Sequence, residues 1–452
     1  MTKNQDNKAE LNASSLAKEF VWLYNIMQLR FASYFGGESQ YKKIADIKAP
    51  DLSKDSSIYA QIVRDLKFNN DERVILLLAL APHLSPQLLD MFFTKNETYG
   101  RGFTEFGGVK GNQHSGFIPT GETAAFIIAG TDISKRFDVI SYFNEEHSFK
   151  TKNIIQLDRI KSTEPILSGI LNISKDFLSL FTNGEEYIPP FNSEFPAQKL
   201  TTKLDWSDLV VEPYVLDEIE EILKWLEYRH QIMEEWGLQK FIKPGYRALF
   251  YGPPGTGKTL TVSLLGKSSK RDVYRVDLSK IVSKYIGETE KNLANIFDQA
   301  ENKEWILFFD EADAIFGKRT NTQDAKDRYA NQEIAYLLQR MEEFPGLLIL
   351  ATNLKSNMDE AFARRFQSMI YFPLPSHSMR LRLWENTFSN FEFEENLNLK
   401  EIAKNYELTG GTMINILSYV SLRAAERGNR KIAKKDIIHG IRKEFRKEGK
   451  TI

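Results

Sequence analysis

The sequence of 452 residues contains no cysteine and only six histidines. Without cysteine there can be no disulfide bond, no thiolate metal site and no cysteine nucleophile, and the composition fits the reducing cytoplasm in which we expect the protein. Long apolar runs are also missing. The longest covers residues 74–81, too few to cross a bilayer, and the polar N-terminus lacks the apolar stretch of a signal peptide. We therefore expect a soluble, cytoplasmic protein without a membrane partner.

No sign of charge dominates the chain. The 60 Lys and Arg residues oppose 61 Asp and Glu residues, which gives a formal net charge of −1. A chain with this charge balance has no overall electrostatic attraction to nucleic acid. The net charge would not reveal a basic face confined to one domain. The few histidines show no paired ligand spacing, so they indicate no histidine metal site.

The chain divides by pattern into two unlike halves. We expect residues 1–13 to be disordered and residues 14–185 to form a mostly helical domain, with a strand-like run at 154–160. Small helices followed by a hairpin-like end would fit a winged-helix module. This half has no chemical motif, so by elimination we assign it to partner recognition. Residues 186–204 are interrupted by proline and lack periodicity, and we place the interdomain linker there.

Residues 205–375 alternate strand-like apolar runs with helical segments, which predicts an α/β domain with a parallel sheet. The first run ends in GPPGTGKT, a complete phosphate-binding loop of the P-loop NTPases. The glycines allow backbone N–H groups to close around a phosphate. The motif predicts that Lys258 reaches the β- and γ-phosphates of a nucleotide and that the Thr259 hydroxyl holds Mg²⁺. The predicted nucleotide-binding residues here are Gly252, Pro253, Pro254, Gly255, Thr256, Gly257, Lys258, Thr259 and Leu260.

Two further strand ends supply polar groups at the same edge of the sheet. The run ILFF is followed by Asp310, predicted to hold Mg²⁺ through water, and by Glu311, predicted to polarise the attacking water. A strand followed by an acidic helix cap is the plainer interpretation of this pair, but it loses weight after a phosphate loop. The run LLILAT is followed by Asn353, placed to orient the same water.

The ordered motifs GPPGTGKT, FFDEAD, LATN and DEAFARRF resemble those of the AAA subgroup of the AAA+ ATPases, over more than half of the chain. In that family the matching arginines reach the γ-phosphate of a neighbouring subunit. The resemblance therefore implies that Arg364 and Arg365 act in trans and that the active form is a ring, typically a homo-hexamer. The plainer alternative is a solvated basic helix end.

The same resemblance assigns further parts of the site. Asp208 and Val210 match the family's adenine-binding segment, and Gly410 and Gly411 match the start of a small helical lid, which spans residues 376–452. No second sensing arginine stands in the lid, because Gly411 occupies the matching position. Members of this subgroup usually lack that arginine too.

A loop that resembles the first pore loop of AAA unfoldases contains Tyr285, Ile286 and Gly287. An aromatic side chain facing a central channel can grip polypeptide of any sequence through apolar contact. The alternative is that Tyr285 packs between subunits. A second polar loop, residues 316–329, is a candidate for the same channel.

The resemblance is strongest to bacterial AAA ATPases encoded with extracellular contractile injection systems, which are phage-tail-like particles. It implies an ATP-driven ring that remodels, threads or assembles protein substrates, with particle components as the expected substrates. The alternative is a nucleic-acid-associated AAA+ regulator that uses its winged-helix module to bind DNA. Tyr285 and the near-neutral charge favour the first hypothesis, and a basic face on the N-terminal half would favour the second.

Overall fold

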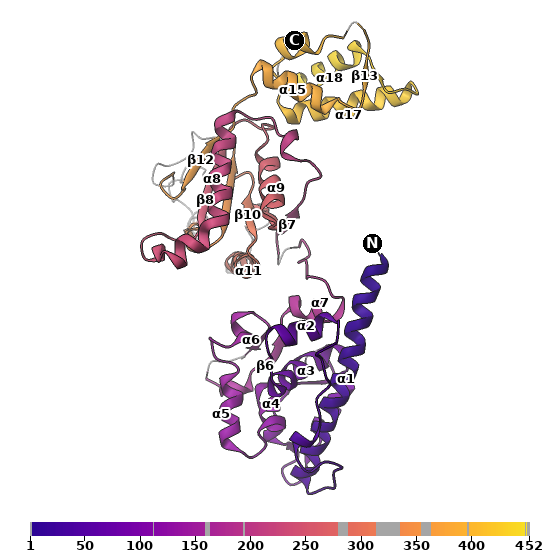
Figure 1. Cartoon of the computed structure of the whole chain (residues 1–452), viewed down its shortest axis with the longest axis vertical. Helices are drawn as coiled ribbons and strands as arrows, with labels where there is room; N and C mark the ends of the chain where they lie inside the picture. Colours follow the sequence, from indigo (N-terminus) through magenta and orange to yellow (C-terminus); the bar gives the residue numbers. More distant parts are fainter. Residues whose placement is uncertain are drawn as a thin grey trace. The chain divides into compact units, whose positions relative to one another are not determined.

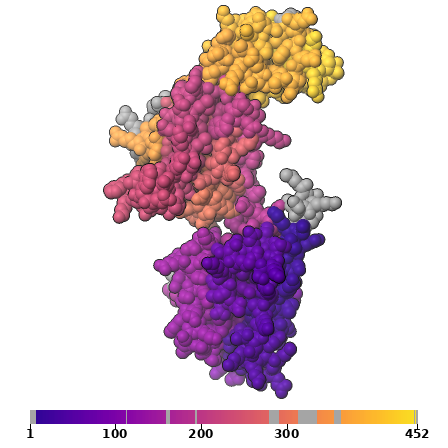
Figure 2. Space-filling view, in the orientation of Figure 1, coloured from indigo at the N-terminus to yellow at the C-terminus, as the bar shows by residue number. Residues whose placement is uncertain are grey.

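The chain folds into two compact units that divide between Ile188 and Pro189. We call them the N-terminal unit and the C-terminal unit, and Figures 1 and 2 show their ribbon and their surface. The computed structural model describes residues 2–111, 113–158, 163–192, 195–278, 288–312, 335–353, 363–395, 397–447 and 449.

The N-terminal unit is organised around α1 (Thr2–Phe35), a long helix that packs on α2 (Ile58–Asp65), α3 (Asn70–Leu84) and α7 (Lys175–Thr182) (Figure 1). Helix α3 is the centre of the core, because its apolar residues 74–81 are all buried. The prediction that residues 1–13 are disordered is wrong for residues 2–13, which form the first turns of α1.

Contacts distant in sequence hold this first part of α1. The Asn12 side chain is fully buried, donates to the carbonyl of Leu180 at 2.8 Å and accepts from the backbone N–H of Tyr59 at 3.1 Å. A polar residue that satisfies two buried backbone groups stabilises the helix through tertiary structure, which local composition does not reveal.

The shorter elements complete the N-terminal unit. Strands β5 and β6 form an antiparallel pair, and the winged-helix assignment stays a prediction. The main shorter elements are η2 (Pro86–Phe93), α4 (Gly121–Ile128), α5 (Ile133–Ser141), α6 (Ser148–Thr151), β5 (Ile155–Asp158) and β6 (Ile170–Ile173).

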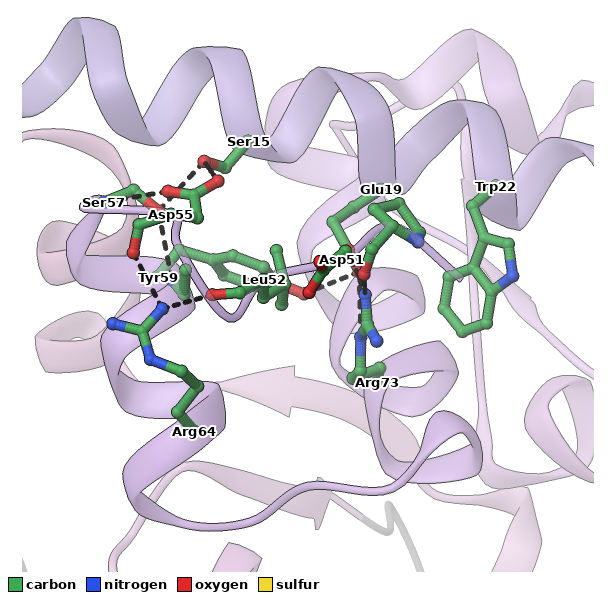
Figure 3. Close-up of polar contacts among 12 residues, drawn as sticks. Ser15, Glu19, Trp22, Asp51, Leu52, Asp55, Ser57, Tyr59, Arg64 and Arg73 are labelled. Carbon is green, nitrogen blue, oxygen red and sulfur yellow. Dashed lines mark hydrogen bonds and ion pairs between the residues drawn. The ribbon is translucent and has the colours of Figure 1, made fainter. Parts of the chain in front are cut away.

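A buried ion pair joins α1 to α3 inside this unit (Figure 3). Glu19 is fully buried and pairs with Arg73, while the Tyr59 hydroxyl donates to Glu19 Oε2 at 3.0 Å. The Arg73 guanidinium also lies 5.0 Å from the ring centroid of Trp22 and donates to the carbonyl of Pro50 at 3.0 Å. Burial raises the pKa of Tyr59 well above its usual value, and the charge of Glu19 adds to the shift.

The C-terminal unit is built on a six-stranded sheet in the order β12-β8-β11-β10-β9-β7. Five strands are parallel, as the alternating pattern predicted, and β7 is antiparallel at the edge. The strands are β7 (Ala197–Leu200), β8 (Tyr246–Tyr251), β9 (Val273–Val276), β10 (Ile306–Phe309), β11 (Leu347–Thr352) and β12 (Ser368–Tyr371).

Strand β7 corrects the predicted linker, which covered residues 186–204. Residues 197–200 pair with β9, and the carbonyl of Pro196 accepts from the N–H of Asp277 at 2.9 Å. The proline-punctuated composition concealed a short edge strand, since its stability comes from pairing with β9 rather than from its own sequence.

Helices cover both faces of the sheet, because successive strand residues point to opposite sides. In β8, Ala248 and Phe250 pack with α8 (Pro213–His230) and α9 (Lys258–Ser269), while Leu249 packs with the other face. That other face is covered by α11 (Glu288–Asn302) and by a helix at residues 335–343.

A helical subdomain follows the sheet, as the lid prediction expected. Its core is centred on the fully buried Trp384 and Phe388, and a two-residue parallel pair, β13 (Glu392–Phe393) with β14 (Lys431–Ile432), joins its loops. The helices are α15 (His377–Thr387), α16 (Leu399–Asn405), α17 (Gly410–Glu426) and α18 (Lys434–Lys447).

Among the described residues no single helix combines the length and apolarity of a membrane span; only α3 taken together with η2 does, as a pair bent by 103°.

Candidate nucleotide-binding site

A cavity of about 620 Å³ opens at the carboxyl edge of the parallel strands, which is where ligands bind in open α/β sheets. The loop after β8 forms one wall, the ends of β10 and β11 a second, and the helical subdomain a third. Its volume is that of a nucleotide-sized site. The position matches the edge at which the sequence placed its motifs.

The loop after β8 requires glycine at two positions for different reasons. Gly252 has a φ of 140°, and a Cβ there would lie 2.2 Å from the carbonyl oxygen of Phe372. Gly255 has a φ of 75°, and a Cβ there would lie 2.5 Å from Thr409 Oγ1 in the helical subdomain. The loop can therefore close tightly only with glycine at both positions.

Lys258 begins α9 and is buried to 7% exposure. Its ammonium donates to three neutral oxygens: the carbonyls of Gly252 at 2.7 Å and Pro253 at 2.9 Å, and Asn353 Oδ1 at 3.1 Å. The positive end of α9 and this ammonium face the same cavity, so the two favour an anion there.

The end of β10 brings a carboxylate to the loop. Thr259 Oγ1 donates to Asp310 Oδ2 at 3.4 Å, and the Glu311 N–H donates to Asp310 Oδ1 at 3.0 Å. Glu311 has a φ of 53°, in the left-handed region that a residue other than glycine seldom adopts. This backbone turns the exposed Glu311 away from the strand direction, and both carboxylates line the cavity.

Asn353 directly follows β11 and lines the cavity between the loop and Glu311. Its amide oxygen accepts from Lys258, so the structure brings together the predicted residues of three strand ends. All of the predicted loop residues from Pro254 to Leu260 line the cavity, and Gly252 and Pro253 contribute carbonyls that orient Lys258.

The segment before α8 and the start of α17 close the cavity on its other sides. Asp208 and Val210 line it, with Val210 buried and the Asp208 carboxylate accepting from the N–H of Asp205 at 2.8 Å. Gly410 and Gly411 also line it, and the N–H of Gly411 donates to the carbonyl of Gly255 at 3.1 Å. The helical subdomain thus contacts the phosphate loop directly.

Sequence reasoning missed an apolar wall opposite the phosphate loop. Part of it comes from i, i+4 and i, i+3 pairs on α15 and α17, a spacing that marks one helix face and was visible in the sequence. The missed lining residues include Leu209, Val211, Phe372, Met379, Leu383, Ile414 and Leu417.

Arg364 and Arg365 lie elsewhere. Neither is among the described residues that line the cavity. Both precede β12, which runs parallel to β8. They therefore lie at the amino ends of the parallel strands, whereas the phosphate loop lies at the carboxyl ends. The carbonyl of Arg365 bonds to Arg247, four positions before the last residue of β8, which is about 13 Å along the strand.

Three predicted site residues, Tyr285, Ile286 and Gly287, lie outside the described residues, as does the polar loop at 316–329. Within the described residues, no group of three or more His, Asp or Glu side chains is arranged to hold a metal ion.

Comparison with known proteins defines the class of this site. Residues 248–374 match the family described as ATPase family associated with various cellular activities (AAA). The matched span runs from within β8 to the residues after β12, so it contains the phosphate loop and both carboxylates. The chain therefore contains an AAA domain.

Among curated proteins, the chain is 36% identical over 165 residues to Cell division protein C of Sulfolobus acidocaldarius, covering 34% of this chain and 44% of that protein. It is 30% identical over 240 residues to the Proteasome-activating nucleotidase of Archaeoglobus fulgidus, covering 51% and 59%. It is 33% identical over 197 residues to the Peroxisomal ATPase PEX6 of Saccharomyces cerevisiae, covering 41% and 19%. The chain spans less than two thirds of the length of each of these relatives.

Proposed function

We propose that the protein is an ATPase that hydrolyses ATP to ADP and phosphate in this cavity. The observation that carries the proposal is the convergence of Lys258, Thr259, Asp310, Glu311 and Asn353 at one edge of a parallel sheet. The AAA domain and the relatives named as ATPase and nucleotidase support it.

Each side chain has a distinct part in that reaction. Lys258 stabilises negative charge on the β- and γ-phosphates, because its ammonium is held in the phosphate loop by the carbonyls of Gly252 and Pro253. Glu311 orients a water whose oxygen attacks the γ-phosphorus while the bond to the bridging oxygen breaks. Asn353, held next to Lys258, positions the same water.

Thr259 and Asp310 are the residues that would hold Mg²⁺. A hydroxyl and a carboxylate 3.4 Å apart offer the hard oxygen donors that this ion prefers, and Mg²⁺ at nucleotide sites keeps most of its ligands as water and phosphate. Bound there, the ion would neutralise developing phosphate charge.

The position of the two arginines supports a site completed by a second copy of the chain. Arg364 and Arg365 lie at the amino ends of the parallel strands, whereas the cavity of their own subunit opens at the carboxyl ends and is not lined by them. In a closed ring, the surface of one subunit that carries these arginines would face the nucleotide cavity of the next subunit. A homo-hexamer with Arg364 and Arg365 acting in trans is the assembly that the sequence resemblance implies.

The proposed substrate is polypeptide. The name of one relative, Proteasome-activating nucleotidase, associates nucleotide hydrolysis with a protein-degrading machine, and Tyr285, Ile286 and Gly287 would form the gripping loop. That contractile injection particles supply the substrate rests on the sequence resemblance alone. Capture of proteins by the Glu311→Gln variant in its native cell, followed by mass spectrometry, tests both statements.

The N-terminal unit is proposed to recognise partners. Its residues 1–188 contain 21 Lys and Arg against 23 Asp and Glu, a balance that favours a protein partner over nucleic acid. The nucleic-acid alternative keeps one supporting feature, the β5–β6 pair after small helices. The test is binding of duplex DNA at about 50 mM and about 200 mM salt, the range over which phosphate contacts weaken. Binding that is clear at the lower salt and weaker at the higher salt would support the nucleic-acid alternative.

The test of the composite site is complementation. A chain with a dead pocket, Lys258→Ala, and a chain without the arginines, Arg364→Ala with Arg365→Ala, should each be inactive. Mixed rings contain interfaces that join an intact pocket to intact arginines, so ATP turnover should return. The mixing ratio is scanned, because turnover can require consecutive intact interfaces. An arginine variant that retains full turnover alone would contradict the composite site.

A further inference from the structure

Arg247 is a buried cation that the proposed reaction does not use. It is the second residue of β8 and is only 5% exposed. Burying a guanidinium is costly unless its donors are satisfied, so its position in a core strand calls for partners. Burial lowers its pKa, and the nearby charge of Glu342 acts in the opposite direction.

The guanidinium joins two segments that are distant in sequence. Arg247 Nε donates to the carbonyl of Arg365 at 3.2 Å, and Nη1 donates to the carbonyl of Glu342 at 3.0 Å. Glu342 lies in the last turn of the helix at 335–343, where carbonyls lack intrahelical partners. Arg247 therefore ties the end of this helix to the segment that carries Arg364 and Arg365.

Backbone contacts fix the same junction from the strand side. The N–H of Arg247 donates to Gln367 Oε1 at 2.9 Å, and the N–H of Gln367 donates to the carbonyl of Arg247 at 2.9 Å. Gly245 lets the helix end approach, since a Cβ there would lie 1.9 Å from the carbonyl oxygen of Phe344.

The Glu342 side chain continues the junction towards the surface. Its carboxylate pairs with Arg365 and with Lys243, whose Nζ lies 3.2 Å away. Although burial acts to raise it, the pKa of Glu342 is lowered because of its hydrogen bonds and charge contacts with Arg365 and Lys243. Arg364 is exposed and makes no ion pair within the described part of the chain, so the two arginines differ in their surroundings.

We propose that Arg247 is a positioning residue for Arg364 and Arg365. Its guanidinium holds the Arg365 backbone against the end of helix 335–343, and this contact fixes the position from which the two arginines reach the nucleotide of the neighbouring subunit. Glu342 holds the Arg365 side chain as part of the same clamp. The proposal rests on the trans role of the arginines under the proposed function. It predicts that loss of Arg247 impairs the arginines a subunit presents and spares its own pocket.

The complementation assay separates these two effects. Arg247→Met is added either to the arginine donor (Lys258→Ala) or to the pocket donor (Arg364→Ala with Arg365→Ala). In the arginine donor it should reduce the rescued turnover by about 10- to 100-fold, the scale expected for a misplaced catalytic group. In the pocket donor it should leave the rescued turnover and the affinity for a fluorescent ATP analogue unchanged.

Arg271→Met is the matched control. Arg271 is also a partly buried arginine of this unit, paired with Glu304 beside β9, and β11 and β10 separate that strand from β8. It should show no difference between donors. Arg247→Lys retains the buried charge and, if Arg247→Met does not fold, serves in its place, with a smaller loss in the arginine donor only.

Equal loss in both donors, loss confined to the pocket donor, or no loss would overturn the clamp. The mixture of the two donors that carry no Arg247 substitution tests the proposed function separately. Absence of rescue there overturns the composite site and the clamp with it, whereas normal rescue with no effect of Arg247 overturns the clamp alone.

Discussion

Glu311 adopts a left-handed backbone conformation between a core strand and residues outside the described part of the chain. A conformation of this kind costs on the order of 1–3 kcal/mol and persists where the surroundings impose it, which fits a residue that must face a ligand. The motif pointed to Glu311 from the sequence, but the backbone conformation depends on tertiary structure.

Glu311→Gln should retain ATP binding and lose turnover by about 100-fold or more, because the phosphate and Mg²⁺ ligands remain while the orienting carboxylate is lost. Steady-state phosphate release and equilibrium binding of a fluorescent ATP analogue measure the two properties. Unchanged phosphate release would remove Glu311 from the reaction. Glu301→Gln is a control on the same unit, with an exposed carboxylate in α11.

Lys258→Ala should instead weaken nucleotide binding, by about 10- to 100-fold, because the buried ammonium pairs directly with phosphate charge. Titration of the analogue against the variant gives the dissociation constant. Lys224→Ala, which removes an exposed lysine of α8 in the same unit, controls for the loss of one lysine. Near-native affinity of Lys258→Ala would contradict the phosphate-loop assignment.

Among the elements, the parallel strands and the nucleotide-binding loop were predictable, because each carries a periodic or motif signal of its own. β7 and the first turns of α1 were not. Their stability depends on the partner strand β9 and on Leu180 and Tyr59, residues more than 40 positions away. The apolar wall from α15 and α17 was partly predictable. The spacing of its residues was visible in the sequence, but the cavity that they line was not.

The link between α1 and α3 gives a prediction for the N-terminal unit. Glu19→Ala leaves Arg73 buried without its carboxylate, which should destabilise the unit by about 3–5 kcal/mol. Hydrogen exchange of peptides from α1 and α3 in the full chain reports on this unit separately. Glu10→Ala removes an exposed carboxylate of the same helix and should change little. Equal protection in both variants would show that the pair contributes nothing to stability.

For the whole molecule, the composite site predicts activity that depends on protein concentration. Turnover per chain should rise with total concentration as subunits assemble, and it should fall on dilution, because the arginines of one chain complete the pocket of another. Phosphate release measured alongside sedimentation velocity relates turnover to assembly state. Constant turnover per chain across a monomer population would contradict a site shared between copies.

The edge strand β7 is the first strand of the C-terminal sheet that the chain reaches after the N-terminal unit. The chain that follows the N-terminal unit joins the sheet at Ala197, which pairs with Val276, and Pro196 bonds to Asp277 just before the segment that contains Tyr285. A pull on the N-terminal unit would therefore be transmitted to the β7–β9 hydrogen bonds, next to the segment that contains the proposed gripping loop. Tension on a captured partner and tension on a gripped polypeptide would converge on this one strand pair.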